Sequence, residues 1–301
     1  MKMLIITQAV DKNHPVLGFF HRWIEGFAKH VEHVHVIALQ TGEYNLPKNV
    51  TVHSLGKENG KGKIQIIFNY YSLPFKLRRE YGAVFVHMNP EYIVLAGWWW
   101  RLNGKKVALW YTHKSVNLKL RIAEFFTNII FTASKESFRF PSKKLQVMGH
   151  GIDTDFFKPD ENIVRGNHAL SVGRLMKTKR HDLAIQKAKE ASLPLRIVGE
   201  GSERERLMER VKELNAEVTF LGALTQEQLR HEYQTAHMLI HTSETGSLDK
   251  VVLEAAACGL PVDSSDPAIS ALPLSPSYVR EHHSLEKLIP RIINTYEAPS
   301  F

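Results

Sequence analysis

The sequence predicts an α/β protein built from two Rossmann-like, doubly wound domains that face each other across a cleft. Short apolar, β-branched runs alternate with amphipathic helical stretches, the pattern of parallel sheets covered by helices. The pattern restarts after Pro159, so we expect a first domain of residues 1–155 and a second of residues 156–301. A chain of 301 residues is long enough for two domains of ordinary size.

The first domain is expected to open with a buried strand, MLIITQ at residues 3–8. This run is too short for a signal sequence and lacks a small-residue cleavage site, and no run of ~20 apolar residues indicates a transmembrane helix. The elements that follow are strands at 33–39, 50–55, 83–88, 106–113 and 129–134, with helices at 21–31 and 117–128.

The second domain is expected to repeat this order of strands and helices. Its strands lie at 169–174, 194–199, 217–222 and 237–242, and its helices at 182–191, 203–214 and 227–236. A stretch rich in Pro and Ser and a final helical run at 283–297 follow. Ligands of doubly wound sheets bind at the carboxyl ends of the strands, so residues directly after each strand are the candidates for a site.

The chain is basic, with 39 Lys and Arg against 31 Asp and Glu, a net charge of +8 and a pI of about 9.4. This charge suits nucleic acid, an anionic membrane surface or an anionic small substrate, or it is a solvated surface with no specific partner. The absence of zinc-finger spacing and of an RNP-like motif argues against nucleic acid. The single cysteine, Cys258, excludes an intramolecular disulfide and fits a reducing cytoplasm.

The segment from Ser243 to Val262 carries the strongest chemical signal, because a loop of small residues precedes a helix with Glu254 in its expected first turn. Backbone N–H groups at a helix N-terminus attract a diphosphate, and a nearby carboxylate can accept hydrogen bonds from both hydroxyls of a ribose. Upstream, Arg174 follows a strand and Lys179 lies five residues later. Together these features suit a nucleotide diphosphate leaving group.

Four motifs in this order resemble the donor half of the retaining glycosyltransferases of the GT-B fold, family 4. They are SVGRLMKTKRHDLAIQKA, LRIVGEGSERERL, VTFLGALTQEQLRHEY and HMLIHTSETGSLDKVVLEAAACGLPV. The linker HGIDTDFFKPD at residues 150–160 resembles that family's interdomain signature. The resemblance implies transfer of a sugar from a nucleotide diphosphate sugar to a hydroxyl acceptor, a glycan or a lipid-linked molecule, without a metal or another cofactor.

The resemblance also implies roles for individual residues. Arg174 and Lys179 would stabilise the charge on the leaving diphosphate, and Glu254 would bind the ribose. His113, at the end of a strand in the acceptor domain, would line the cleft near the transferred sugar. The remaining donor contacts would come from Gly18, Gly173, Gly199, Leu221, Gly246, Ser247 and Leu248. His87 is a second cleft candidate, whereas His150 would only cap the hinge between the domains.

The sequence departs from this family in two places. The family has two glutamates separated by seven residues, and the first falls on Gly246 here. Glu244 or Asp249 could supply the missing contact to the donor sugar. The second domain is also shorter than expected after about residue 263.

A metal site is not expected. The histidines show no H-E-x-x-H or similar spacing, and Asp153-Thr154-Asp155 lies within the linker signature of a family that needs no metal.

The acceptor side has features of a membrane-binding surface. Residues 57–79 mix basic with apolar and aromatic residues, Trp98-Trp99-Trp100-Arg101 follows, and residues 117–126 add Lys119 and Arg121. Such mixtures suit anionic bilayers, which predicts a cytoplasmic protein peripheral to the inner face of a membrane. The alternative is a set of core aromatics beneath a basic helix face.

Two other functions fit the same sequence. A nucleotide-sugar epimerase can share the two-domain fold but needs acid–base groups aimed at the sugar, and no such pair stands out. A catalytically silent nucleotide-sugar-binding or scaffold protein would be consistent with Gly246 and the short second domain. Transfer to an acceptor, interconversion without an acceptor, and binding without turnover separate the three functions.

Overall fold

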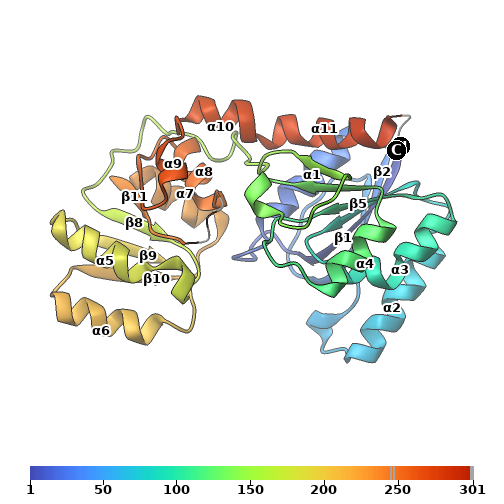
Figure 1. Ribbon diagram of the computed structural model, residues 1–301, viewed down its shortest axis with the longest axis horizontal. Coiled ribbons are helices and arrows are strands. Elements are labelled where there is room, and N and C mark those ends of the chain that lie inside the picture. The colour runs from blue at the N-terminus through green and yellow to red at the C-terminus, as the bar shows by residue number, and fades with distance from the viewer. Residues whose placement is uncertain (245, 247, 299–301) are drawn as a thin grey trace. The chain divides into compact units, whose positions relative to one another are not determined.

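A computed structural model describes residues 1–244, 246 and 248–298 of the chain (Figure 1). The chain divides into two compact α/β units. Unit 1 comprises Met1–Gly151 and the segment that begins at Leu285, and unit 2 comprises Ile152–Ser284. Each unit contains one parallel sheet with helices on both faces, which confirms the predicted class of two Rossmann-like, doubly wound units.

The sheet of unit 1 has the strand order β3-β2-β1-β4-β5-β6-β7, with every neighbouring pair parallel. β1 is buried along both faces, as its continuous apolar sequence predicts. The strands are β1 (Lys2–Val10), β2 (His33–Thr41), β3 (Val50–Ser54), β4 (Ala83–His87), β5 (Lys106–Trp110), β6 (Ile129–Thr132) and β7 (Leu145–Val147).

Alternate residues of β1 belong to two cores, one on each face of this sheet. Met3 and Ile5 pack with residues of α1 and α11, whereas Leu4 and Ile6 pack with residues of α2, α3 and α4. The helices of this unit are α1 (Phe19–His30), α2 (Lys63–Lys76), α3 (Glu91–Leu102), α4 (Leu118–Phe126) and α11 (Leu285–Glu297).

The last helix, α11, returns to unit 1 and packs beside α1 (Figure 1). Its apolar residues recur at helical spacing and enter the same core as Met3. The Tyr296 hydroxyl donates to the Val84 carbonyl at 2.7 Å. Unit 2 therefore differs from the expected second domain of residues 156–301, because the sequence pattern of a helix does not indicate which sheet it covers.

The sheet of unit 2 has the order β10-β9-β8-β11-β12 and is also parallel throughout. β8 is central, and the chain winds outward through β9 and β10 before it returns to β11 on the other side. The strands are β8 (Ala169–Val172), β9 (Leu195–Val198), β10 (Val218–Gly222), β11 (Met238–His241) and β12 (Val262–Ser264).

Helices of unit 2 also cover both faces of their sheet. α5 and α6 enclose one core and α7 and α8 enclose the other. No helix among the described residues is long and apolar enough to cross a membrane. The helices are α5 (His181–Glu190), α6 (Arg204–Leu214), α7 (Gln226–Thr235), α8 (Lys250–Ala257), α9 (Pro267–Ser270) and α10 (Pro276–His283).

Candidate functional site

The carboxyl ends of two neighbouring strands form the candidate site in unit 2. β8 and β11 pair in register at Leu170 and Leu239, although β9 and β10 separate them in the sequence. The direction of winding reverses between these two strands, and such switch points are where doubly wound sheets bind ligands. The segments that begin at Gly173 and Thr242 therefore meet here.

Glycines let the loops after β8 and β9 pack backbone against backbone. Gly199 has a φ of +132°, and a Cβ there would lie 2.0 Å from the Gly173 carbonyl oxygen, so only glycine fits. The Gly173 N–H donates to Val198 O at 3.0 Å, and the Gly199 N–H donates to Gly222 O at 2.8 Å. The predicted donor residues Gly173 and Gly199 thus shape the loops at this edge of the sheet.

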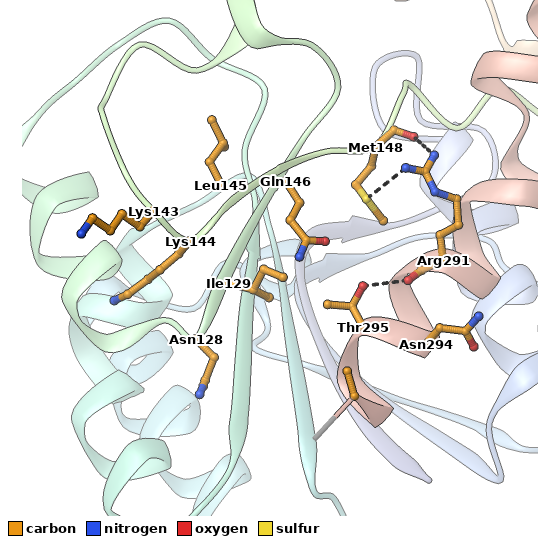
Figure 2. Close-up of a pocket in the computed structure, with 11 residues that line it drawn as sticks. Asn128, Ile129, Lys143, Lys144, Leu145, Gln146, Met148, Arg291, Asn294 and Thr295 are labelled. Carbon is orange, nitrogen blue, oxygen red and sulfur yellow. Dashed lines mark hydrogen bonds between the residues drawn. The ribbon is translucent and has the colours of Figure 1, made fainter. Parts of the chain in front are cut away.

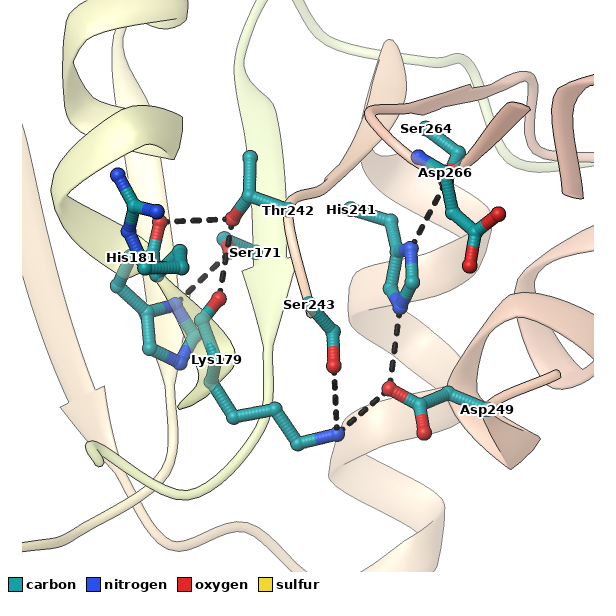
Figure 3. A network of polar contacts seen from close by, with 10 residues as sticks. Ser171, Lys179, His181, His241, Thr242, Ser243, Asp249, Ser264 and Asp266 are labelled. Atoms are coloured by element: carbon teal, nitrogen blue, oxygen red, sulfur yellow. Dashed lines mark hydrogen bonds and ion pairs between the residues drawn. The ribbon is translucent and has the colours of Figure 1, made fainter. Parts of the chain in front are cut away.

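Lys179 and Asp249 form a largely buried ion pair in the site (Figure 3). Lys179 Nζ lies 2.5 Å from Asp249 Oδ2 and 3.4 Å from Ser243 Oγ. Lys179 ends the short 3₁₀ turn after β8, Ser243 follows β11, and Asp249 immediately precedes α8. Three segments far apart in the sequence therefore bring a cation, a hydroxyl and a carboxylate together.

His241, buried at the end of β11, contacts the same carboxylate (Figure 3). Its Nε2 lies 3.1 Å from Asp249 Oδ2, and its Nδ1 lies 3.0 Å from Ser264 Oγ. Burial alone would raise the pKa of Asp249, but the hydrogen bond from His241 and the charge of Lys179 outweigh it and hold that pKa well below its usual range. Asp249 is therefore ionised at neutral pH.

Hydrogen bonds between the loops after β8 and β11 fix the position of Lys179. The Thr242 hydroxyl donates to the carbonyls of Lys179 and Arg180 at 3.1 and 2.8 Å, and the Glu244 N–H donates to Thr178 O at 2.9 Å. The Arg180 guanidinium also pairs with the exposed Glu244 carboxylate. Two acids were predicted to contact a sugar. Asp249 contacts Lys179 and His241 in a partly buried cluster, whereas Glu244 is exposed and pairs with Arg180.

His181, the first residue of α5, supports the loop after β8. It is buried, and its Nδ1 lies 3.0 Å from Ser171 Oγ on β8 (Figure 3). Burial lowers the pKa of His181 to about 4, so the imidazole is neutral at pH 7. It therefore adds no charge beside Lys179.

Glu254 lies one turn further into its helix than the sequence analysis placed it. α8 begins at Lys250, so Glu254 is in the second turn and is 3% exposed. Its Oε2 accepts the Tyr233 hydroxyl at 3.2 Å, and its Oε1 lies 3.1 Å from Lys250 Nζ. Because Tyr233 is fully buried whereas Lys250 is partly exposed, the Lys250 contact is the more accessible of the two.

The remaining predicted donor residues differ in exposure. Arg174 is exposed directly after β8, whereas Leu221 and Leu248 are half-buried against the core of α7 and α8. Gly246 is exposed, and its φ of +57° lies in the left-handed region that favours glycine over glutamate. Ser247 lies outside the described residues.

Predicted site residues of the N-terminal region belong to unit 1. Gly18 is buried, and a Cβ there would lie 2.7 Å from two backbone carbonyl oxygens, so the loop before α1 requires glycine. His113 is exposed beyond the end of β5, and its Nδ1 accepts the Ser115 N–H at 3.1 Å. His87 is buried and stacks on Phe20 with ring centroids 3.9 Å apart, as expected for a packed histidine.

The linker residues perform local structural roles. Asp153 Oδ1 accepts the N–H groups of Asp155 and Phe156, which caps the turn there, and Asp155 pairs with Arg280. Gly151 has a φ of +66°, and its carbonyl accepts the Trp23 indole N–H at 3.1 Å. Within residues 1–244, 246 and 248–298, no group of three or more His, Cys, Asp or Glu side chains is arranged to hold a metal ion.

A separate cavity of about 670 Å³ lies in unit 1 between β7 and α11 (Figure 2). Its basic residues include Arg291, which donates to Met148 O at 3.1 Å, and Lys144, which donates to Glu124 O at 2.6 Å. None of the predicted site residues lines this cavity. It therefore plays no part in the candidate site.

Sequence reasoning missed several polar residues of the site, namely His241, Thr242, Ser264, His181 and Tyr233. His241 and Thr242 end a predicted strand, and that position alone could have marked them as candidates. Tyr233 lies in a helix whose pattern shows only that one face is apolar. Its bond to Glu254 depends on the packing of α7 against α8, which a single sequence does not reveal.

Comparison with known proteins supports the motifs found in this unit. Residues 153–271 match the family described as glycosyl transferases group 1. This region is therefore similar to the glycosyl transferases group 1. A curated relative, the D-inositol 3-phosphate glycosyltransferase of Mycobacterium leprae, is 32% identical over an alignment of 151 residues that covers 44% of this chain and 34% of the relative. The chain thus spans about a third of the length of that relative.

Solved structures resemble the whole chain. The glycosyltransferase AviGT4, involved in avilamycin A biosynthesis, matches with a TM-score of 0.71 at 14% identity, covering 99% of this chain and 97% of AviGT4. HepE of Anabaena, solved in complex with UDP, gives 0.66 at 14% identity and 99% and 90% coverage. UDP-GlcNAc 2-epimerase of Methanocaldococcus jannaschii gives 0.60 at 12% identity and 99% and 100% coverage. At these identities they show the fold alone, which is that of the GT-B glycosyltransferases.

Proposed function

We propose that this chain is a glycosyltransferase that binds a nucleoside diphosphate sugar at the carboxyl ends of β8 and β11 and transfers the sugar to a hydroxyl acceptor. The convergence of Lys179 and His241 on the partly buried Asp249 carboxylate, with Ser243 beside Lys179, carries this proposal, because such a place stabilises negative charge. The match of residues 153–271 to glycosyl transferases group 1 supports the same activity.

The proposed transfer retains the configuration of the sugar. The acceptor oxygen attacks the anomeric carbon on the face from which the diphosphate leaves, so one carbon–oxygen bond forms as another breaks. The acceptor proton passes to an oxygen of the leaving phosphate. Lys179 and Arg174 neutralise the charge on that phosphate, which is the electrostatic contribution that preorganised cations make, and the proposal assigns no step to a metal or a cofactor.

In this proposal, binding of the donor separates Asp249 from Lys179. A bound diphosphate would take over the Lys179 ammonium and free the Asp249 carboxylate from its ion pair. Asp249 would then accept hydrogen bonds from hydroxyls of the donor sugar, the role for which Gly246 has no side chain. Its position immediately before α8 keeps it beside the helix N-terminus throughout.

The other predicted residues complete the donor site. Glu254 would bind the ribose in place of its contact with Lys250, and Leu221 would line the base. The backbone of Gly246, Ser247 and Leu248 would approach the phosphates and the sugar. From unit 1, Gly18 would supply a donor contact and His113 would orient an acceptor hydroxyl.

A transfer assay tests this function. A thermal-shift panel of UDP, GDP and ADP first selects the base, since a ligand at 100 times its dissociation constant stabilises a protein by about 2.7 kcal/mol. The selected donor sugar is then incubated with glycan, lipid-linked and inositol phosphate acceptors, the last suggested by the name of the M. leprae relative. We expect an α-linked product from an α-linked donor by NMR, with the same rate in EDTA. Sugar interconversion without an acceptor would contradict the proposal in favour of an epimerase.

A second candidate function is nucleotide-sugar binding without catalysis. The ion pair between Lys179 and Asp249 favours it, because the cation that a donor needs already has a partly buried partner. So does Gly246, which leaves the usual carboxylate position empty. Binding of a donor sugar with no product from any acceptor class, in a protein that remains folded throughout the assay, would support this second function.

A further inference from the structure

The outer surface of the helices on one face of the unit 1 sheet is strongly apolar. Sixteen large hydrophobic residues are exposed among the described residues, and nine of them belong to α2, α3 or α4. Helices that cover a sheet usually expose polar residues on their outer side. The nine are Ile64, Ile67, Phe68, Tyr71 and Phe75 of α2, Trp98 and Leu102 of α3, and Leu118 and Phe125 of α4.

A groove between α2 and α3 lies within this surface. It has a volume of about 250 Å³, and its walls include Tyr71, Pro74 and Phe75 of α2 and Trp98 and Trp99 of α3. The volume exceeds that of an apolar cavity of ~150 Å³ that takes up benzene, yet it is below the ~300 Å³ at which sites for drug-sized ligands begin. Because its walls are apolar and aromatic, the groove suits a segment of hydrocarbon chain better than a polar headgroup.

Basic residues are concentrated in and beside α2. Residues 57–79 contain six basic residues and one acid, Glu58, whose carboxylate accepts the hydroxyls of Ser54 and Thr41. The Arg78 guanidinium lies 4.5 Å from the centre of the Phe75 ring, so a positive charge stands beside the groove. The six are Lys57, Lys61, Lys63, Lys76, Arg78 and Arg79.

We propose that the α2–α4 face binds an anionic lipid bilayer and that the α2–α3 groove takes up one lipid hydrocarbon chain. Apolar contact and attraction of basic residues to anionic headgroups are the two signals that together give stable attachment. Aromatic rings such as Tyr71 and Trp98 suit the boundary between headgroups and chains. A second copy of the chain is a poorer occupant, because its net charge of +8 repels an identical surface. This inference does not depend on the donor site.

Trp98 and Trp99 provide a direct readout, because both line the groove and Trp98 is 48% exposed, whereas Trp23, Trp100 and Trp110 are buried. The experiment compares vesicles of phosphatidylcholine with vesicles containing phosphatidylglycerol, with and without bromine on the lipid chains. We expect co-sedimentation only with the anionic vesicles, weakened by salt, and quenching of tryptophan emission by the brominated chains. Trp98→Phe should keep binding but lose part of the quenching, and the double variant Trp98→Phe, Trp99→Phe should lose most of it.

Phe75→Glu tests the groove, because it places a carboxylate among the apolar walls. Phe75 is exposed, so the variant should fold, which its melting temperature checks. We expect at least a tenfold loss of vesicle binding, whereas Val164→Glu, at a 90% exposed position of unit 2, should change binding less than twofold. Two results overturn the proposal. The first is no binding to anionic vesicles. The second is binding that shows no bromine quenching and is unchanged in Phe75→Glu. A dimer in light scattering that Phe75→Glu dissociates would assign the face to a second copy instead.

Discussion

The two units use the same parallel α/β layout but place opposite chemistry at the carboxyl ends of their central strands. In unit 2, β11 ends at His241, which holds an ionised carboxylate beside Lys179. In unit 1, β4 ends at His87, which stacks on Phe20, and Trp110 at the end of β5 packs against Trp23. The layout determines where side chains converge, whereas the residues after each strand determine whether an anion or an aromatic cluster is stabilised there.

The largest expected effect is on the backbone packing that supports the site of unit 2. Gly199→Ala would place a Cβ 2.0 Å from Gly173 O at a φ of +132°, so the variant should lose at least about 4 kcal/mol of unfolding free energy or fail to fold. Gly82→Ala in unit 1 is the matched control, because its Cβ would meet nothing within 4 Å. Urea denaturation measures the unfolding free energies of both variants. Equal stabilities would show that the loops after β8 and β9 relax freely.

A cavity in the core beneath α11 should lower the stability of unit 1 alone. Ile292 is fully buried in the core of α1 and β1, so Ile292→Ala should cost about 3 kcal/mol, whereas Asn294→Ala on the exposed side should cost less than about 0.5 kcal/mol. Hydrogen exchange should rise in β1 and α1 but not in residues 152–284. Faster exchange confined to unit 2 would assign α11 to the second domain, as the sequence had indicated.

Acid should weaken unit 2 through His181. Burial lowers its folded-state pKa to about 4, below the unfolded value of about 6.5, so the neutral imidazole stabilises the fold fully above pH 6.5. As the pH falls from 6.5 toward 4, about 2 kcal/mol of that contribution should be lost. Hydrogen exchange of unit 2 amides at pH 7 and 4.5, in native protein and in His181→Gln, measures it. A variant with the same acid sensitivity as the native protein would remove His181 as the cause.

Removal of the Asp249 carboxylate should have a smaller effect than the changes above, and it should strengthen nucleotide binding. Asp249→Asn takes the negative charge from Lys179, so we expect a nucleoside diphosphate without sugar to bind about tenfold more tightly, equivalent to about 1.4 kcal/mol. Glu244→Gln, the exposed acid of the same loop, should change affinity less than twofold. Titration calorimetry at fixed salt provides both values. Weaker binding to Asp249→Asn would make Asp249 a direct ligand of the nucleotide instead.

The sequence predicted most strands and the doubly wound units because apolar β-branched runs and helical periodicity are local features. It also indicated Lys179 and Glu254, since each follows a recognisable strand or loop. It did not predict the return of α11 to unit 1, because several cores could bury the same apolar face. The sequence also did not predict that Lys179 pairs with Asp249, because Lys179 reaches Asp249 and Ser243 only when β8 and β11 become neighbours.

The central claim is that Lys179 binds the diphosphate of a nucleotide. Calorimetric titration of UDP, GDP and ADP into native protein, Lys179→Ala and Lys177→Ala tests it most directly, because Lys177 is an exposed lysine of the same turn. We expect one nucleotide to bind the native protein and Lys177→Ala within twofold of each other, and to bind Lys179→Ala at least tenfold more weakly, since a charge-assisted hydrogen bond contributes about 1.5–3 kcal/mol. Equal affinity of the native protein and Lys179→Ala, or no binding of any nucleotide by the native protein, would contradict the claim.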